Sequence, residues 1–241
     1  MRPRGPTTEK EIWKITRRTI NIIQNQLTSN VCLFGSAGAT LWADTGRVPN
    51  VRARCLHSHT YLLPTQDIDI VVSLIHGDAE SIKRVIVNAD GRYFLEPSKK
   101  RNATHKVLFC RLPGWRAYGR RVKVDILVSG TMGLPYVDSS YTPIIIHIPV
   151  MPLFDLLVMK TQGWDDHRKS NRKDYRAKLD TDVTDVDALL DRAMDEGVSY
   201  DAESAAFRHT SEFLRRALTL ARKFAHHHGR WEKWRTIDFP L

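Results

Sequence analysis

The stretch at residues 65–72, TQDIDIVV, is the feature that most constrains this 241-residue chain. Its β-branched residues predict a strand at about 68–74, and side-chain alternation places Asp67 and Asp69 on the same face. At about 3.3 Å of rise per residue, the two carboxylates lie roughly 7 Å apart. Two like charges at that distance repel each other, and a divalent metal ion with oxygen ligands, such as Mg²⁺, would offset the repulsion. By itself the pair also fits a strand end, with Asp67 in a turn and Asp69 in solvent.

A glycine-containing turn precedes this acidic strand. Residues 31–34 form a short apolar run that predicts a buried strand, Gly35-Ser36 follows, and a helix is expected to continue to about residue 44. Glycine lets the backbone approach a ligand closely, and the N–H groups at a helix N-terminus favour phosphate. The Ser36 hydroxyl can add a hydrogen bond. Taken alone, this motif is more typical of an ordinary turn.

A third carboxylate, Asp125, lies in a strand predicted at residues 121–128. Alternation places the apolar residues of this strand on one face and Lys123 and Asp125 on the other. A carboxylate in the middle of a strand is costly to bury unless it is paired or binds a metal ion. If Asp125 stood alone, an edge strand with an Asp125–Lys123 pair would be the simpler interpretation. Three carboxylates on neighbouring strands near a glycine turn instead favour a shared metal site.

In this order, Gly35-Ser36, Asp67-Ile68-Asp69 and Asp125 resemble the motifs of the nucleotidyltransferase superfamily related to DNA polymerase β. That family has Gly-Ser or Gly-Gly after a strand, Asp-x-Asp on the next strand and a third Asp on a later one. Residues 65–72 are most similar to its minimal and AbiEii-like branch.

Two segments of the second half, residues 155–160 and 182–190, are similar to helical motifs of the same branch. One departure is the separation of the Gly-Ser turn from the paired aspartates. Residues 37–66 intervene here, whereas the family usually has about ten residues at this place.

The resemblance implies a Mg²⁺-dependent enzyme with two metal ions, for which Mn²⁺ is an alternative. Asp67 and Asp69 would bind both ions, one of which holds the β- and γ-phosphates of a nucleoside triphosphate. Asp125 would bind the other ion, or act as a general base toward the acceptor hydroxyl. These three aspartates are therefore the predicted catalytic and metal-binding residues.

The resemblance also implies a set of nucleotide-binding residues. Gly35 and Ser36 would hold the triphosphate, and Lys160 would neutralise part of its charge if its helix faces the cleft. Asp182 and Asp185 would either support the site or cap the N-terminus of a helix predicted at 183–196, and the cap is the favoured interpretation.

The implied reaction transfers an NMP from an NTP such as ATP to an acceptor hydroxyl and releases pyrophosphate. The acceptor is an RNA end such as that of tRNA, a protein side chain or a small hydroxylated molecule. The alternative is a catalytically inactive nucleotide- or RNA-binding module of the same fold, and the presence of all three aspartates argues against it.

Composition supports a nucleic acid or nucleotide partner and an intracellular protein. The net charge of +10 attracts polyanions, but it also fits a surface charge that only aids solubility, and charge alone does not choose between the two. Cys32, Cys55 and Cys110 are widely spaced, and two of them lie in apolar runs, so we expect reduced thiols rather than a disulfide framework. No secretory signal and no membrane-spanning run are expected, which predicts a cytoplasmic location.

The order of predicted elements indicates a mixed α/β (α+β) fold. A helix at 9–28 and further strands at 93–96, 105–111 and 141–148 surround those already described, and a helix reaches about residue 88. We therefore expect a catalytic domain at 1–150 with a small mixed sheet and helices on one face. The second domain, 151–241, is expected to be all-helical and to complete the substrate cleft. Its predicted helices are 153–162, 183–196 and a basic helix at 202–226.

Overall fold

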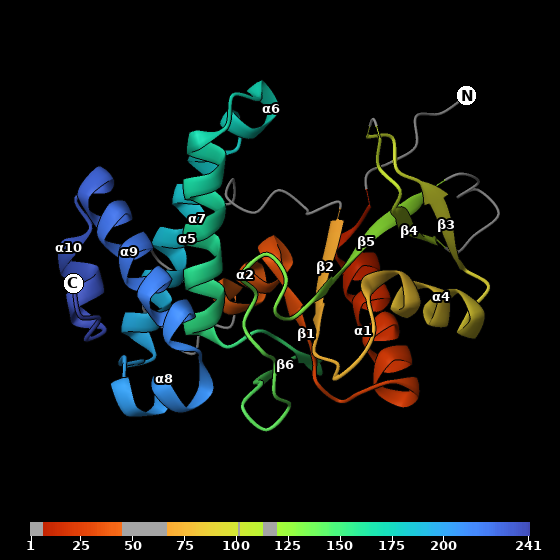
Figure 1. Ribbon diagram of the computed structural model, residues 1–241, viewed down its shortest axis with the longest axis horizontal. Coiled ribbons are helices and arrows are strands. Elements are labelled where there is room, and N and C mark those ends of the chain that lie inside the picture. The colour runs from red at the N-terminus through yellow and green to blue at the C-terminus, as the bar shows by residue number, and fades with distance from the viewer. Residues whose placement is uncertain (1–6, 45–66, 101, 113–119) are drawn as a thin grey trace. The chain divides into compact units, whose positions relative to one another are not determined.

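The computed structural model describes residues 7–44, 67–100, 102–112 and 120–241 (Figure 1). The chain forms two compact units. The described part of the first unit comprises residues 7–37, 67–100, 102–112, 120–131 and 137–151, and that of the second comprises 38–44, 132–136 and 152–241. Residues 45–66, which include Cys55, lie outside the described residues. Each unit is described separately below.

The first unit contains a five-stranded mixed sheet, as the sequence predicts. Its strands, in spatial order, are β1 (Val31–Phe34), β2 (Asp67–Val72), β5 (Arg121–Val128), β4 (Lys106–Arg111) and β3 (Tyr93–Pro97). β2 and β5 run parallel, and the other neighbouring pairs run antiparallel. The last strand of the chain to enter this sheet, β5, is therefore its central strand.

Two amphipathic helices, α1 (Glu9–Gln26) and α4 (Ala79–Ala89), cover one face of this sheet. α1 lies against β1 and β2, and α4 lies against β3 and β5. Thr8 and Glu11 form the expected capping box at the start of α1, and Asp78 caps α4. The apolar positions of these helices pack against the strands, so one sheet face is buried. The prediction of helices on one face is confirmed.

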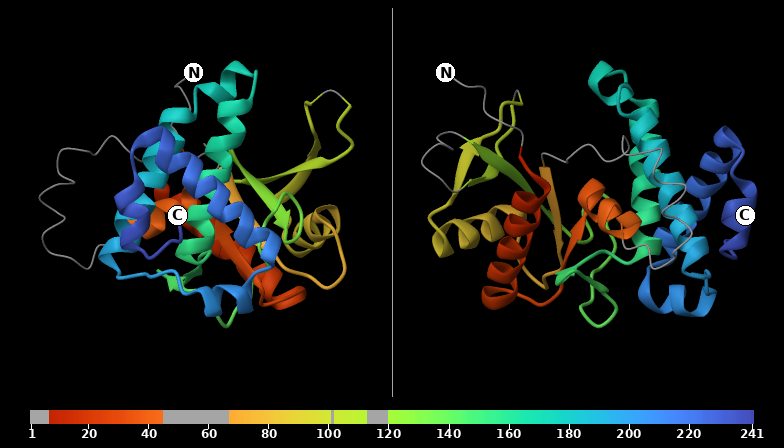
Figure 2. Two further views of the ribbon diagram at one scale, coloured as in Figure 1. Left: turned by 60° about the vertical axis from the view of Figure 1, so that its left-hand side comes forward. Right: turned by 180° about the vertical axis from the view of Figure 1, so that it is seen from behind.

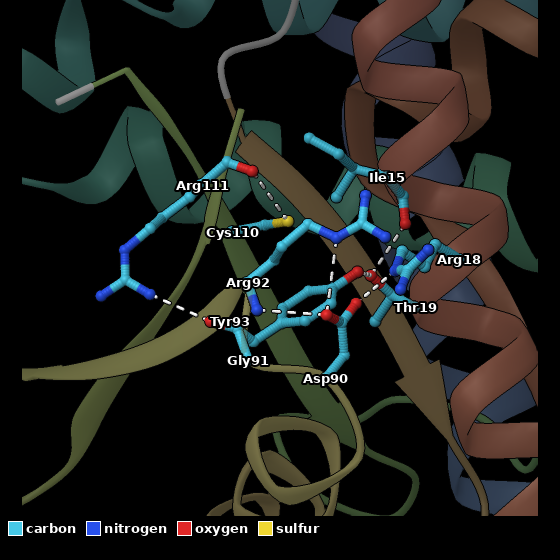
Figure 3. Close-up of polar contacts among 9 residues, drawn as sticks. All are labelled: Ile15, Arg18, Thr19, Asp90, Gly91, Arg92, Tyr93, Cys110 and Arg111. Atoms are coloured by element: carbon cyan, nitrogen blue, oxygen red, sulfur yellow. Dashed lines mark hydrogen bonds and ion pairs between the residues drawn. The ribbon is translucent and has the colours of Figure 1, made fainter. Parts of the chain in front are cut away.

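A polar cluster fastens α1 to the far edge of the sheet (Figure 3). The carboxylate of Asp90 accepts a hydrogen bond from Arg18 Nε, and Arg92 Nε lies 3.5 Å from the same carboxylate. Burial alone would raise the pKa of Asp90, but the hydrogen bond from Arg18 lowers it below its ordinary value. The buried Tyr93 hydroxyl lies 2.7 Å from Thr19 Oγ1, and burial raises the pKa of this phenol. The cluster holds the helix layer in a fixed register on β3 and β4.

The second unit is helical. It includes most of α2 (Gly35–Asp44), followed by α5 (Leu153–Lys169), α6 (Lys173–Arg176), α7 (Leu179–Asp195), α8 (Ala202–Arg208), α9 (Ser211–His228) and α10 (Trp231–Thr236). α5 lies alongside both α7 and α9 (Figure 2). The apolar residues between these helices, among them Trp164, Leu190 and Phe224, are almost fully buried. Among the described helices, none is long and apolar enough to cross a lipid bilayer.

Several boundaries differ from the sequence prediction. The helix predicted at 202–226 is two helices, because Thr210 accepts a hydrogen bond from the backbone N–H of Phe213 and starts α9 anew. The helix predicted at 153–162 continues to residue 169. The strand predicted at 141–148 is instead a short hairpin of β6 (Ile144–Ile145) and β7 (Ile148–Pro149).

Candidate active site

The three predicted aspartates lie on one face of the sheet, on its two central parallel strands. In the β2–β5 register, Asp69 is directly opposite Asp125, and Asp67 is opposite Lys123. The residues that alternate with them, Ile68 among them, are fully buried beneath the helices. The carboxylates of β2 and β5 therefore share the sheet face that α1 and α4 do not cover. The arrangement is what alternation and the shared motif order predict.

The position of β5 separates two interpretations of Asp125. The sequence alone leaves open an edge strand on which Asp125 pairs with Lys123. The edge position is wrong, because β5 has β2 on one side and β4 on the other. The pairing is present, since Lys123 Nζ donates a hydrogen bond to Asp125 Oδ2. The central position of β5 places Asp125 beside Asp69 rather than at the edge of the sheet.

Lys123 balances part of the negative charge of this cluster. Its Nζ contacts Asp125 and lies 3.6 Å from Asp67 Oδ2. Burial alone would lower the pKa of Lys123, but the hydrogen bond to Asp125 and the charges of the aspartates raise it above its ordinary value. The side chain thus stays cationic at neutral pH. The contact with Asp67 depends on the β2–β5 register, a non-local property that the sequence pattern does not contain.

The glycine turn lies directly against the acidic strands. Gly35 follows β1, has φ +68°, and a Cβ added to it would lie 2.2 Å from Asp69 Oδ2. Any larger residue would force the Asp69 carboxylate to move, and the positive φ disfavours other residues as well. Ser36 comes next, in the first turn of α2. The structure therefore brings Gly35 and Ser36 to the same place as the paired aspartates.

The donor set suits a hard divalent cation. Three carboxylates converge on a surface that solvent reaches, with the Asp67 side chain 53% exposed and that of Asp125 33% exposed. Carboxylate oxygens are the ligands that Mg²⁺ prefers, with water completing its octahedron. Among the described residues, no three His, Cys, Asp or Glu side chains are already arranged around a common metal position. The Lys123 ammonium group contacts two of the three carboxylates, so it would have to move for them to share an ion.

The remaining predicted residue, Lys160, belongs to the helical unit. It lies on α5, is 8% exposed, and its Nζ lies 2.5 Å from Asp185 Oδ2 on α7. About one turn before Asp185 on α7, Asp182 Oδ2 lies 2.5 Å from His167 Nδ1. The interpretation of Asp182 and Asp185 as helix caps is wrong, because α7 already begins at residue 179 and both aspartates face α5. The role of Lys160 toward a triphosphate stays a prediction.

Comparison with known proteins finds a solved structure with a similar fold. A search of family models finds no match, and no curated protein matches the sequence. Among solved structures, the chain is similar to the crystal structure of an antigenic nucleotidyltransferase-like protein from Paracoccidioides brasiliensis, with a TM-score of 0.63 and 12% sequence identity. The alignment covers 98% of this chain and 96% of that one. At this identity, the likeness shows that the two chains share a nucleotidyltransferase-like fold.

Proposed function

We propose that this protein is a Mg²⁺-dependent nucleotidyltransferase that transfers an NMP from an NTP to an acceptor hydroxyl and releases pyrophosphate. The observation that carries the proposal is the register that sets Asp69 opposite Asp125, with Gly35 in contact with Asp69. The nucleotidyltransferase-like fold supports the general class. The motifs at residues 65–72 and 155–160 support, more narrowly, the minimal and AbiEii-like branch.

The three carboxylates have distinct tasks in this proposal. Asp67 and Asp69 would hold the two divalent ions, one of which would bind the β- and γ-phosphates, and Asp125 would serve the acceptor side. When bound, the ions supply Lewis-acid stabilisation of the phosphoryl oxygens and lower the pKa of the acceptor hydroxyl. Asp125 orients that hydroxyl or takes its proton, and both roles need its position opposite Asp69. Gly35 and Ser36 offer backbone and hydroxyl donors to the triphosphate.

One observation favours a second candidate, a binding module without turnover. Lys123 contacts two of the three carboxylates, so it already offsets part of the negative charge of the cluster without a metal ion. In that case the sheet face would bind a nucleotide or RNA through its cations. The retention of all three aspartates on one face is better explained by the transferase.

A transfer assay distinguishes the two functions. The full chain is incubated with Mg²⁺, each of the four α-³²P-labelled NTPs, and separate pools of total RNA and total protein. We expect label to enter one pool only when Mg²⁺ is present, with pyrophosphate formed in equal amount. Saturable binding of NTP with no product in any pool would instead establish the binding module.

Lys123→Met is expected to tighten binding of divalent ions by up to about fivefold. The ammonium group competes with the metal ion for Asp67 and Asp125, and a partly exposed ion pair contributes at most about 1 kcal/mol. Titration with Mn²⁺, followed by the electron paramagnetic resonance signal of the free ion, measures this affinity without turnover. Lys14→Met, at an exposed position of α1, is the matched control and should leave the affinity unchanged. Equal affinity in the Lys123 variant would show that these carboxylates are not the ligands.

A further inference from the structure

Two phenylalanines and two arginines form a layered group on the sheet face that carries the aspartates. The rings of Phe94 and Phe109 stack with centroids 5.8 Å apart and planes at 27°. The guanidinium carbon of Arg111 lies 4.3 Å from the centre of the Phe94 ring, and that of Arg121 lies 4.1 Å from the centre of the Phe109 ring. We call these four residues the aromatic–arginine platform.

Strand register brings the platform together from three strands. Phe94 on β3 pairs with Phe109 on β4, and Arg111 on β4 pairs with Arg121 on β5. The residues that alternate with them, such as Cys110, point into the core beneath the helices. The described part of the first unit places α1 and α4 on that opposite face. Among the described residues of this unit, both arginines are exposed and both rings are partly exposed, so none of these residues closes the layer to a ligand.

A hydrogen bond from an Nη1 atom holds each of the two guanidinium groups in place. Arg111 Nη1 donates a 3.0 Å hydrogen bond to the carbonyl oxygen of Gly91, and Figure 3 shows this side chain extended away from Tyr93 and the helix layer. Arg121 Nη1 donates to Glu96 Oε1. Glu96 pairs with Arg121 while Arg111 bonds a neutral carbonyl group, so the two arginines and Glu96 together carry a net positive charge.

The platform is continuous with the candidate active site. Phe109 pairs with Lys123, and Lys123 pairs with Asp67, so the three side chains form one row across adjacent strands. Strands lie about 4.8 Å apart, which places Phe109 roughly 10 Å from Asp67 along this row. That distance is about three stacked nucleotides at roughly 3.4 Å each. A strand of nucleic acid lying on the platform can therefore reach the carboxylates with its end.

We propose that the aromatic–arginine platform binds single-stranded RNA and presents the terminal ribose hydroxyl to the aspartates as the acceptor. This inference rests on the proposed transferase function and names its acceptor. Bases stack on aromatic rings and on guanidinium planes, while the N–H edges of arginine bind phosphate. The chain's net charge of +10 favours such a polyanion. An RNA end carries two adjacent hydroxyls, which suits an acceptor site.

The chemistry of the platform selects a single strand over a duplex. Flat rings and guanidinium planes can stack only with bases that are not already paired and stacked in a helix. Proteins recognise a duplex through groove shape and phosphates instead. Two phenylalanines at the centre of a sheet face contribute little to binding of that kind. A 12-nucleotide unpaired RNA and a hairpin of the same composition therefore differ in affinity.

Fluorescence anisotropy of a 5′-fluorescein-labelled 12-nucleotide RNA, without NTP or Mg²⁺, tests the platform independently of transfer. Phe109→Leu should weaken binding about tenfold through loss of one stacking surface. Arg111→Lys combined with Arg121→Lys keeps the charge but removes the planar groups, and should weaken binding several-fold. Arg111→Gln with Arg121→Gln should also reduce the slope of log affinity against log salt by about 1.4.

Arg84→Gln on α4 removes one exposed cation from the helix-covered side and is the matched control. It should change affinity less than twofold. Equal affinities of the wild-type protein and the folded lysine and glutamine variants would overturn the platform. So would equal binding of the hairpin.

The outcomes separate this inference from the proposed function. Platform-dependent RNA binding without label transfer would refute the transferase and leave the RNA site standing. Transfer to protein or a small molecule, with RNA affinity unaffected by platform substitutions, would refute the RNA site and leave the transferase standing. Circular dichroism of each variant shows whether it is folded. If Phe109→Leu does not fold, the arginine variants still test the platform.

Discussion

Asp69→Asn is expected to lower Mg²⁺-dependent nucleotide transfer by roughly 10³-fold or more while leaving the fold intact. The substitution keeps the shape of the side chain but removes one anionic ligand opposite Asp125, at the centre of the sheet. Losing a ligand in a metal-assisted phosphoryl transfer costs several kcal/mol of transition-state stabilisation, at about 1.4 kcal/mol for each tenfold in rate. The initial rate of α-³²P-NMP incorporation measures the effect.

The control for this variant is Asp195→Asn, which removes one exposed carboxylate from the end of α7. It should retain full transfer. Thermal unfolding of Asp69→Asn should resemble that of the wild type, because the change also relieves repulsion among the three aspartates. Asp67→Asn is expected to lose activity in the same way. Undiminished transfer in either variant would refute the assignment of the acidic cluster as the catalytic site.

Asp185→Ala is expected to lower the free energy of unfolding by about 3 kcal/mol. The substitution removes the carboxylate that the Lys160 ammonium group contacts at 2.5 Å, between α5 and α7, where both side chains are at most 10% exposed. A buried charge that loses its counterion costs far more than the intact pair contributes. Urea denaturation followed by far-ultraviolet circular dichroism measures the difference.

Two further variants test this explanation. Lys160→Met combined with Asp185→Leu removes both charges, so it should cost less than Asp185→Ala alone. Asp191→Ala removes an exposed carboxylate of the same helix, 2.6 Å from Lys233, and should cost well under 1 kcal/mol. If the single and double variants at 160 and 185 are equally unstable, cavity formation rather than uncompensated charge is the cause.

The local parts of the fold follow from the sequence because their determinants are local. The strand at 121–128 has unbroken alternation, and the helix that begins at Glu9 has a capping box, so both were predictable to within about two residues. The break between α8 and α9 was missed because the apolar spacing continues across it and hides the capping role of Thr210. The apolar periodicity over many residues predicts one long helix, whereas the single hydrogen bond of Thr210 is what starts a new one.

The candidate site divides in the same way. Alternation alone places Asp67 and Asp69 on one face, and the motif order associates Asp125 with them. Whether Asp125 lies on an edge or a central strand depends on strand order, which no local pattern encodes, and the bridging position of Lys123 follows from that order. The aromatic–arginine platform was missed for the same reason. Its members come from three strands and become neighbours only through pairing.

The central position of β5 has a consequence for synthesis of the chain. β2 and β4 both use β5 as a partner, so each has an unpaired edge on the ribosome until residues 121–128 emerge. About 50 residues separate β2 from β5, which at roughly 5–20 residues per second means several seconds of exposure. A fragment that ends before this strand would leave the β5-facing edges of β2 and β4 unpaired and would lack the complete acidic cluster. In a newly made chain the sheet therefore becomes complete only after β5 has been synthesised. Translation products that stop before β5 would be prone to aggregate.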